Sequence, residues 1–189
     1  PAVAPGQFSV AQLQREFRFS RAGAETPVYG ILGRPVSHSV SPAMHNAAFD
    51  ATGVDAVYLP FAARDVEDFR AFADAMGVAG ASVTAPFKVG LVAGVAALDT
   101  DATLTGAVNT LVRGAGGWRG CNTDVDGFRA GCADVELGGR RVAVLGTGGA
   151  ARAAALAARR AGAVVTCYGR DRAQADALAA ALGVRAALR

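Results

Sequence analysis

The chain has 189 residues, of which 52% are hydrophobic and 19% charged, and its formal net charge at pH 7 is +3. This composition is too apolar for a disordered chain, and the length suffices for a buried core in one domain or two small ones. The basic residues are scattered, which argues against a nucleic-acid surface, and no apolar run reaches the ~20 residues of a membrane-spanning helix, so we expect a cytoplasmic protein.

The apolar pattern predicts strands that alternate with helices. Residues 1–26 are expected to form a lead-in, in which Ser9 and Gln12 have the spacing of a capping box for a helix over 10–19. The pattern then predicts, in chain order, a strand (28–33), a helix (41–52), a strand (56–61), a helix (65–76), a strand (80–84), an apolar helix (89–98) and a hairpin of two strands (107–113 and 117–121).

A second series of elements follows a junction near residues 122–138. It consists of a connecting helix (124–132), a strand (141–145), a helix (148–160), a strand (163–168) and a helix (172–182). Strands that alternate with helices form mostly parallel sheets covered on both faces, so we predict an α/β fold. The sequence stops where a third strand of the second series begins, and we therefore expect a fragment.

Lysine occurs only once in the chain. Of the 19 basic residues, 18 are arginine and one is Lys88. An arginine-rich composition explains the arginines but not the exception. A lysine ammonium can release its proton and its pKa responds to its surroundings, whereas arginine stays charged. Lys88 is therefore a candidate acid–base group.

A glycine-rich turn joins the strand at 141–145 to the next helix. It consists of five residues, Gly146, Thr147, Gly148, Gly149 and Ala150. This strand–turn–helix context is what a dinucleotide-binding fingerprint requires, because free N–H groups at a helix start and the helix dipole favour phosphates. The alternative is a packed βα turn without a ligand.

The end of the following strand bears on the choice of dinucleotide. Arg170 is placed where a cation would hold the 2′-phosphate of NADP, whereas NAD sites carry an acidic residue at this point. Asp171, one residue later, weakens this inference. Alternatively, Arg170 and Asp171 form only a turn and a helix cap.

Polar clusters interrupt the apolar pattern at four loop ends of the first series. The hydroxyls of Ser37, Ser39 and Ser41 precede a helix, for which Ser41 has the character of an N-cap before a proline. The other clusters contain Thr84 with Lys88, residues 106–110, and residues 121–124. Each alone could be a turn, but four at loop ends predict convergence on a cleft at the carboxyl ends of the strands. His45, inside the helix, is expected to be a packed residue rather than a base.

The cysteines and histidines give no pattern for a disulfide or a metal. Three cysteines lie far apart, at Cys121, Cys132 and Cys167, without a C-x-x-C pair, which indicates a reducing compartment. Only two histidines, His38 and His45, are present, so a zinc site is not expected.

From about residue 28 to 182 the chain resembles shikimate dehydrogenase. The motifs that carry the resemblance occur in the family's order at residues 39–46, 83–88, 106–110, 122–124 and 146–150. The resemblance implies reduction of 3-dehydroshikimate to shikimate with NADP, in the route to aromatic amino acids. It also implies a substrate-binding catalytic domain at 27–121, with a mostly parallel sheet, followed by a partial Rossmann-like NADP-binding domain at 122–189.

The resemblance implies a role for each matching residue. Ser39 and Ser41 would hold the substrate carboxylate, and Thr84, Asn109 and Asp124 its ring hydroxyls. Lys88 would be the acid–base group, paired with Asp124. The glycine turn (Gly146, Thr147, Gly148, Gly149 and Ala150) would bind the pyrophosphate and Arg170 the 2′-phosphate.

Some features leave alternatives open. Residues 169–171 are Gly-Arg-Asp where the family usually has Asn-Arg-Thr, and Ser82 replaces a common asparagine, as in bifunctional relatives. An NAD-dependent quinate/shikimate dehydrogenase and a non-catalytic regulator on the same fold are the alternatives.

The family's tyrosine in the cofactor domain and its C-terminal glutamine would lie beyond Arg189, so the segment alone is expected to be inactive. The enzyme is expected to be a monomer or a homodimer.

The lead-in suggests a neighbouring domain. Residues 4–7, Ala-Pro-Gly-Gln, followed by a short helix, resemble the last active-site loop and tail of a type I dehydroquinate dehydratase. In some organisms that enzyme is fused ahead of shikimate dehydrogenase. The hypothesis is therefore a piece of a bifunctional protein.

Overall fold

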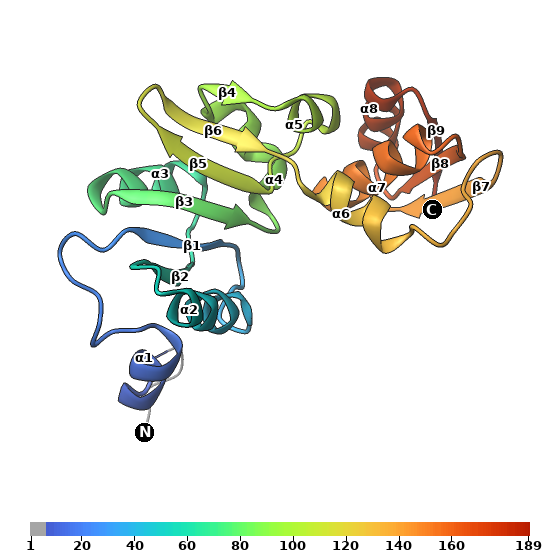
Figure 1. The fold of residues 1–189 in the computed structure, drawn as a ribbon. Helices are drawn as coiled ribbons and strands as arrows, with labels where there is room; N and C mark the ends of the chain where they lie inside the picture. The colour runs from blue at the N-terminus through green and yellow to red at the C-terminus, as the bar shows by residue number, and fades with distance from the viewer. Residues whose placement is uncertain (1–6) are drawn as a thin grey trace. The chain divides into compact units, whose positions relative to one another are not determined.

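The computed structural model describes residues 7–189 (Figure 1). The chain divides between Phe87 and Lys88 into two compact units. Residues 4–6, on which the dehydratase resemblance partly rests, lie outside the described residues. The predicted domain boundary between residues 121 and 122 stays a prediction. Within residues 7–189, no helix has both the length and the apolar character needed to cross a bilayer.

The lead-in begins with the predicted capping box. The Ser9 hydroxyl accepts from the Gln12 N–H at 3.2 Å, and the Gln12 side chain accepts from the Ser9 N–H at 3.0 Å. These bonds satisfy two of the free amides at the start of helix α1 (Val10–Glu16). The helix ends three residues earlier than the sequence predicts, because the chain turns away through Arg18, whose φ is 52°.

Arg18 attaches the lead-in to the first unit. Its side chain is buried, and the guanidinium donates to the backbone carbonyls of Val54 and Ala56. Phe17 beside it is also buried. Phe17 and Arg18 are therefore packed in the first unit, whereas residues 19–25, which lead to β1, are exposed.

The first unit contains a parallel sheet of the order β2-β1-β3. The central strand β1 (Val28–Leu32) pairs in parallel with β2 (Val57–Phe61) and with β3 (Val78–Val83). Helices α2 (Ser41–Thr52) and α3 (Val66–Ala75) make the crossovers that parallel strands require. Strand–helix alternation is thus confirmed here, with element ends within two residues of the prediction.

The start of α2 corrects one prediction. Ser41 is the first helical residue rather than the N-cap, which is Val40 and makes no side-chain capping bond. The Ser39 hydroxyl instead accepts from the Ser41 N–H at 3.2 Å, while Pro42 lacks an N–H. His45 is confirmed as a packed residue, because its ring stacks on Tyr58 with 4.2 Å between centroids.

The second unit opens with a further correction. The apolar run at 89–98 does not form one helix but three short elements, α4 (Phe87–Gly90), a 3-10 turn η1 (Leu91–Gly94) and strand β4 (Ala97–Leu98). Gly90 and Gly94 interrupt the run, and glycine is a poor helix former. The strand is stabilised by pairing, because β4 lies parallel to β6 (Gly117–Cys121).

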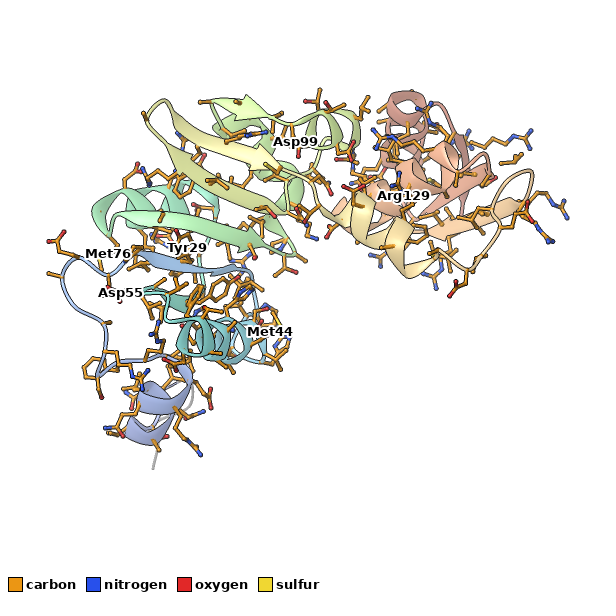
Figure 2. The ribbon with its side chains drawn as sticks, viewed as in Figure 1. Tyr29, Met44, Asp55, Met76, Asp99 and Arg129 are labelled. Atoms are coloured by element: carbon orange, nitrogen blue, oxygen red, sulfur yellow. The ribbon has the colours of Figure 1, made fainter. Side chains whose placement is uncertain are left out.

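A short helix that the sequence analysis missed follows β4. This is α5 (Thr100–Thr105), which Asp99 caps by accepting from the Ala102 N–H at 2.6 Å. Figure 2 labels Asp99 at this point, between β4 and α5. The predicted hairpin is confirmed, with β5 (Thr110–Gly114) antiparallel to β6.

The remainder of the second unit is a three-stranded parallel sheet with helices (Figure 1). Its elements are α6 (Asp124–Gly131), β7 (Arg141–Leu145), α7 (Gly149–Arg160), β8 (Val164–Gly169), α8 (Arg172–Leu182) and β9 (Arg185–Leu188). The strand order is β7-β8-β9, and both pairs are parallel. Its core contains fully buried residues of α7, β8 and α8, among them Leu156, Cys167 and Leu178. The third strand expected after residue 182 is therefore present as β9.

Candidate active site

Lys88 and Asp124 form an ion pair inside the second unit. The Lys88 Nζ lies 2.6 Å from Oδ2 of Asp124, and the two side chains are 17% and 29% exposed. Lys88 lies in α4, where its carbonyl accepts from the Val108 N–H at 2.7 Å, and Asp124 is the first residue of α6. Both charges are partly removed from water yet still reachable, so the pair could exchange a proton with a bound molecule.

Asn109 completes the surroundings of the carboxylate. Its Nδ2 donates to Oδ1 of Asp124 at 2.8 Å and to the Thr123 hydroxyl at 2.9 Å. Its own oxygen accepts from the Thr123 N–H at 2.9 Å. One carboxylate oxygen of Asp124 is thus bonded to the lysine and the other to an amide, which fixes the plane of the carboxylate. The structure therefore brings together Lys88, Asn109 and Asp124.

Ser39, Ser41 and Thr84 lie in the first unit and are partly exposed. Ser39 and Ser41 occupy the turn into α2, where the Ser39 hydroxyl bonds the Ser41 N–H. Thr84 directly follows β3, and its N–H donates to the Leu32 carbonyl at 2.8 Å. Their hydroxyl groups are therefore placed at a helix start and at a strand end, two positions that suit ligand contacts.

The glycine turn leaves the start of α7 open. Gly146 has a φ of 125°, in the region that favours glycine. Gly148 is the N-cap of α7 and makes no side-chain capping bond, and a Cβ there would meet nothing within 4 Å. The first N–H groups of the helix are therefore available to an anion. Gly149, next in the chain, faces Lys88 instead, because a Cβ on it would lie 2.8 Å from the lysine Cβ.

A pocket of about 900 Å³ lies over this turn. It is lined by Gly146, Thr147, Gly148, Tyr168, Gly169, Arg170, Asp171, Gln174 and Arg189. Arg170 is exposed, and no acidic side chain among residues 7–189 forms an ion pair with it. Asp171 is the N-cap of α8 and accepts from the Gln174 N–H at 3.0 Å. The cap interpretation is therefore confirmed for Asp171, and it leaves Arg170 free for a phosphate.

These features fit a phosphorylated dinucleotide. The uncapped helix start and the absence of any side chain at Gly148 suit a pyrophosphate, which needs close approach of backbone N–H groups. A planar guanidinium at the end of β8 suits a terminal phosphate. The residues present are thus those that such a cofactor would require.

Comparison with known proteins agrees with this geometry. Residues 31–111 match the family described as the shikimate dehydrogenase substrate binding domain. The shikimate dehydrogenase (NADP(+)) of Halobacterium salinarum is 48% identical over 160 residues, which are 82% of this chain and 60% of the relative. Over 82% of its length the chain is therefore similar to a shikimate dehydrogenase.

Solved shikimate dehydrogenases share the fold. The Aquifex aeolicus structure superposes with a TM-score of 0.79 at 35% identity, covering 88% of this chain and 64% of that one. The Thermus thermophilus structure, in complex with NADP(H) and shikimate, superposes with a TM-score of 0.74 at 34% identity, covering 85% of this chain and 62% of that one. The chain therefore spans less than two thirds of the length of these relatives. Its α/β fold is confirmed.

Three polar residues near the Lys88–Asp124 ion pair received no role from the sequence. Thr105 lies in α5, which had not been predicted, and its hydroxyl is fully buried. Arg152 was one of 18 arginines, and nothing in its spacing distinguished it. A signal was present for the third, Asn122, because it belongs to the motif at 122–124, but no role had been assigned to it.

Proposed function

We propose that this chain is the substrate-binding part, with a partial cofactor domain, of an NADP-dependent shikimate dehydrogenase that reduces 3-dehydroshikimate to shikimate. The observation that carries the proposal is the 2.6 Å contact between Lys88 and Asp124. It is supported by relatives named as NADP-dependent shikimate dehydrogenases and by a relative's structure that holds shikimate with NADP(H).

Reduction of a ketone needs a proton at the oxygen that becomes an alkoxide. We assign this proton to Lys88 Nζ, whose positive charge also stabilises the developing oxyanion. Asp124 orients the lysine through the bond to Oδ2, and its second oxygen, shared with Asn109, can accept from a ring hydroxyl. Arginine at position 88 would stabilise charge but could not release a proton.

The remaining site residues are assigned to binding. Ser39 and Ser41 would hold the substrate carboxylate, and Thr84 a ring hydroxyl. The glycine turn would hold the pyrophosphate of NADP, and Arg170 its 2′-phosphate. When bound, the cofactor supplies the hydride. We also propose the domain division 27–121 and 122–189, a cytoplasmic location, and a monomer or homodimer.

The test is an assay of the complete gene product for shikimate oxidation with NADP⁺ and with NAD⁺, and for quinate oxidation in parallel. Faster shikimate oxidation with NADP⁺ is expected. Quinate oxidation with NAD⁺ would instead support the quinate/shikimate alternative, and tight shikimate binding without turnover would support a regulator.

Substitution of the lysine tests the assigned role. Lys88→Ala is expected to lower kcat by about 10²–10⁴-fold with little change in KM, because the proton donor is lost while binding groups remain. Lys88→Arg, which keeps the charge, should not restore turnover. Near-normal kcat in either variant would contradict the role.

A further inference from the structure

Two buried polar side chains of the second unit have no part in the proposed mechanism. Asn122 is 2% exposed and Thr105 is fully buried. A buried polar group destabilises a protein unless it is hydrogen-bonded, so the partners of such groups reveal what they hold in place.

The side-chain amide of Asn122 is bonded on both sides. Its Nδ2 donates to the Thr105 hydroxyl and to the Ala107 carbonyl, each at 2.9 Å. Its Oδ1 accepts from the Asp124 N–H at 3.1 Å. The Asn122 N–H donates to Asp99 Oδ2 at 3.2 Å, so backbone and side chain are both fixed. The orientation of this amide is therefore determined.

The bond to Asp124 lies at the start of α6. The N-cap of this helix, Thr123, makes no side-chain capping bond. Asn122 thus satisfies an amide that would otherwise lack a partner at the helix start. Because Asp124 is the first residue of α6, this bond fixes the backbone from which its carboxylate extends towards Lys88 and Asn109.

Arg152 connects the same group of residues to the glycine turn. Its Nη1 donates to the Thr105 carbonyl at 2.9 Å, and its Nε donates to the Thr147 carbonyl at 3.1 Å. Burial lowers the pKa of this guanidinium from its ordinary value, yet arginine remains charged in proteins. Within residues 7–189 no carboxylate pairs with it, so its charge is directed to these two carbonyls.

We propose that Asn122 and Thr105 are positioning residues that fix the Lys88–Asp124 pair. We also propose that Arg152, through its bonds to the carbonyls of Thr105 and Thr147, holds these residues in place relative to the glycine turn. The catalytic part of this inference rests on the proposed function. The structural part does not, and the two are tested separately.

The structural test uses Lys88 as a reporter. Because Lys88 is the only lysine of the 189-residue chain, labelling lysine with ¹³C at Cε gives a single side-chain signal by NMR. Asp124→Asn defines the signal position of a lysine whose partner has lost its charge. We expect Thr105→Val and Asn122→Ser to move the signal from the wild-type position towards that of Asp124→Asn.

Thr103→Val is the matched control. Thr103 also lies in α5 and its hydroxyl also donates to the carbonyl four residues earlier, but it is exposed and has no bond to Asn122. Thr103→Val and Thr105→Ser, which keeps the hydroxyl, should leave the signal in place. A wild-type signal in both folded variants, Thr105→Val and Asn122→Ser, would overturn the proposal, as would an equal displacement in Thr103→Val.

Arg152 is tested against Arg160, a second arginine of α7 that contacts α5 through a 2.6 Å ion pair with Asp101. Arg152→Gln should move the Lys88 signal and weaken NADP⁺ binding, measured by calorimetry, about tenfold, the factor that corresponds to ~1.4 kcal/mol. Arg160→Gln should do neither. An unchanged Lys88 signal or an unchanged NADP⁺ affinity in Arg152→Gln would refute the proposed role of Arg152.

The catalytic test uses the complete gene product. Thr105→Val should lower kcat for shikimate oxidation about 10–100-fold with KM unchanged, because a misplaced catalytic pair costs rate rather than binding. Thr105→Ser should restore it. Wild-type kcat in Thr105→Val would overturn the positioning role, whereas absence of activity in the wild type would refute the proposed function and leave the NMR result to decide the structural claim.

Discussion

Gly149 at the start of α7 lies against the side-chain stem of Lys88. A Cβ on Gly149 would come within 2.8 Å of both Cβ and Cδ of the lysine. The glycine turn and the Lys88 side chain are therefore in direct contact within one unit. The contact leaves no space for a side chain, so the fourth residue of the turn must be small for a reason unrelated to phosphate binding.

This contact predicts that Gly149→Ala impairs catalysis. The methyl group would displace the lysine stem and lengthen the bond to Asp124, so kcat for shikimate oxidation should fall about 10–100-fold. Steady-state kinetics with saturating NADP⁺ separates this effect from weaker cofactor binding.

Gly127→Ala in α6 is the control, because a Cβ there meets nothing within 4 Å. It should keep full activity and stabilise the protein by up to about 1 kcal/mol. A Gly149→Ala enzyme with wild-type kcat would show that the contact has no catalytic consequence.

Arg170 should determine the choice between the two dinucleotides. Arg170→Ala removes the guanidinium that we assign to the 2′-phosphate, so kcat/KM for NADP⁺ should fall about tenfold or more while that for NAD⁺ changes little. The ratio of the two values is the measurement. An unchanged ratio would refute the assignment.

Asp171 should affect stability and not cofactor choice. Its carboxylate caps α8 by accepting from the Gln174 N–H. Asp171→Ala is expected to destabilise the protein by about 1 kcal/mol, measured by denaturant unfolding, and Asp171→Asn should recover most of this loss. A change in the NADP⁺/NAD⁺ ratio as large as that of Arg170→Ala would mean that Asp171 also contacts the cofactor.

Substitution of Asn46 should destabilise the protein strongly, because this buried side chain holds three backbone groups. It is 1% exposed, donates to the carbonyls of Glu16 and Tyr58 at 2.6 and 2.8 Å, and accepts from the Tyr58 N–H at 2.9 Å. Asn46→Ala leaves these groups unsatisfied, so the free energy of unfolding should fall by about 2–3 kcal/mol. Thr52→Ala on the same helix, where the hydroxyl is exposed, should change it by less than about 0.5 kcal/mol. Equal effects of the two variants would contradict this account.

The sequence by itself determined the alternation of strands and helices, because the side chains that a strand or helix buries recur with a fixed period. It also identified Lys88 as an exception in an arginine-rich chain, and the resemblance to a family gave it Asp124 as a partner. Local signals such as the capping box at Ser9 were equally reliable, since both partners lie within one turn of the chain.

Only the tertiary structure decided what depends on partners distant in sequence. Apolar composition at 89–98 favoured a helix, but pairing of β4 with β6 and the two glycines produced three short elements instead. The bonds from Asn122 to Thr105, 17 residues apart, and from Arg152 to Thr105, 47 residues apart, follow no periodicity. A buried polar side chain must find a partner wherever the fold supplies one, and that choice is made by packing rather than by local sequence.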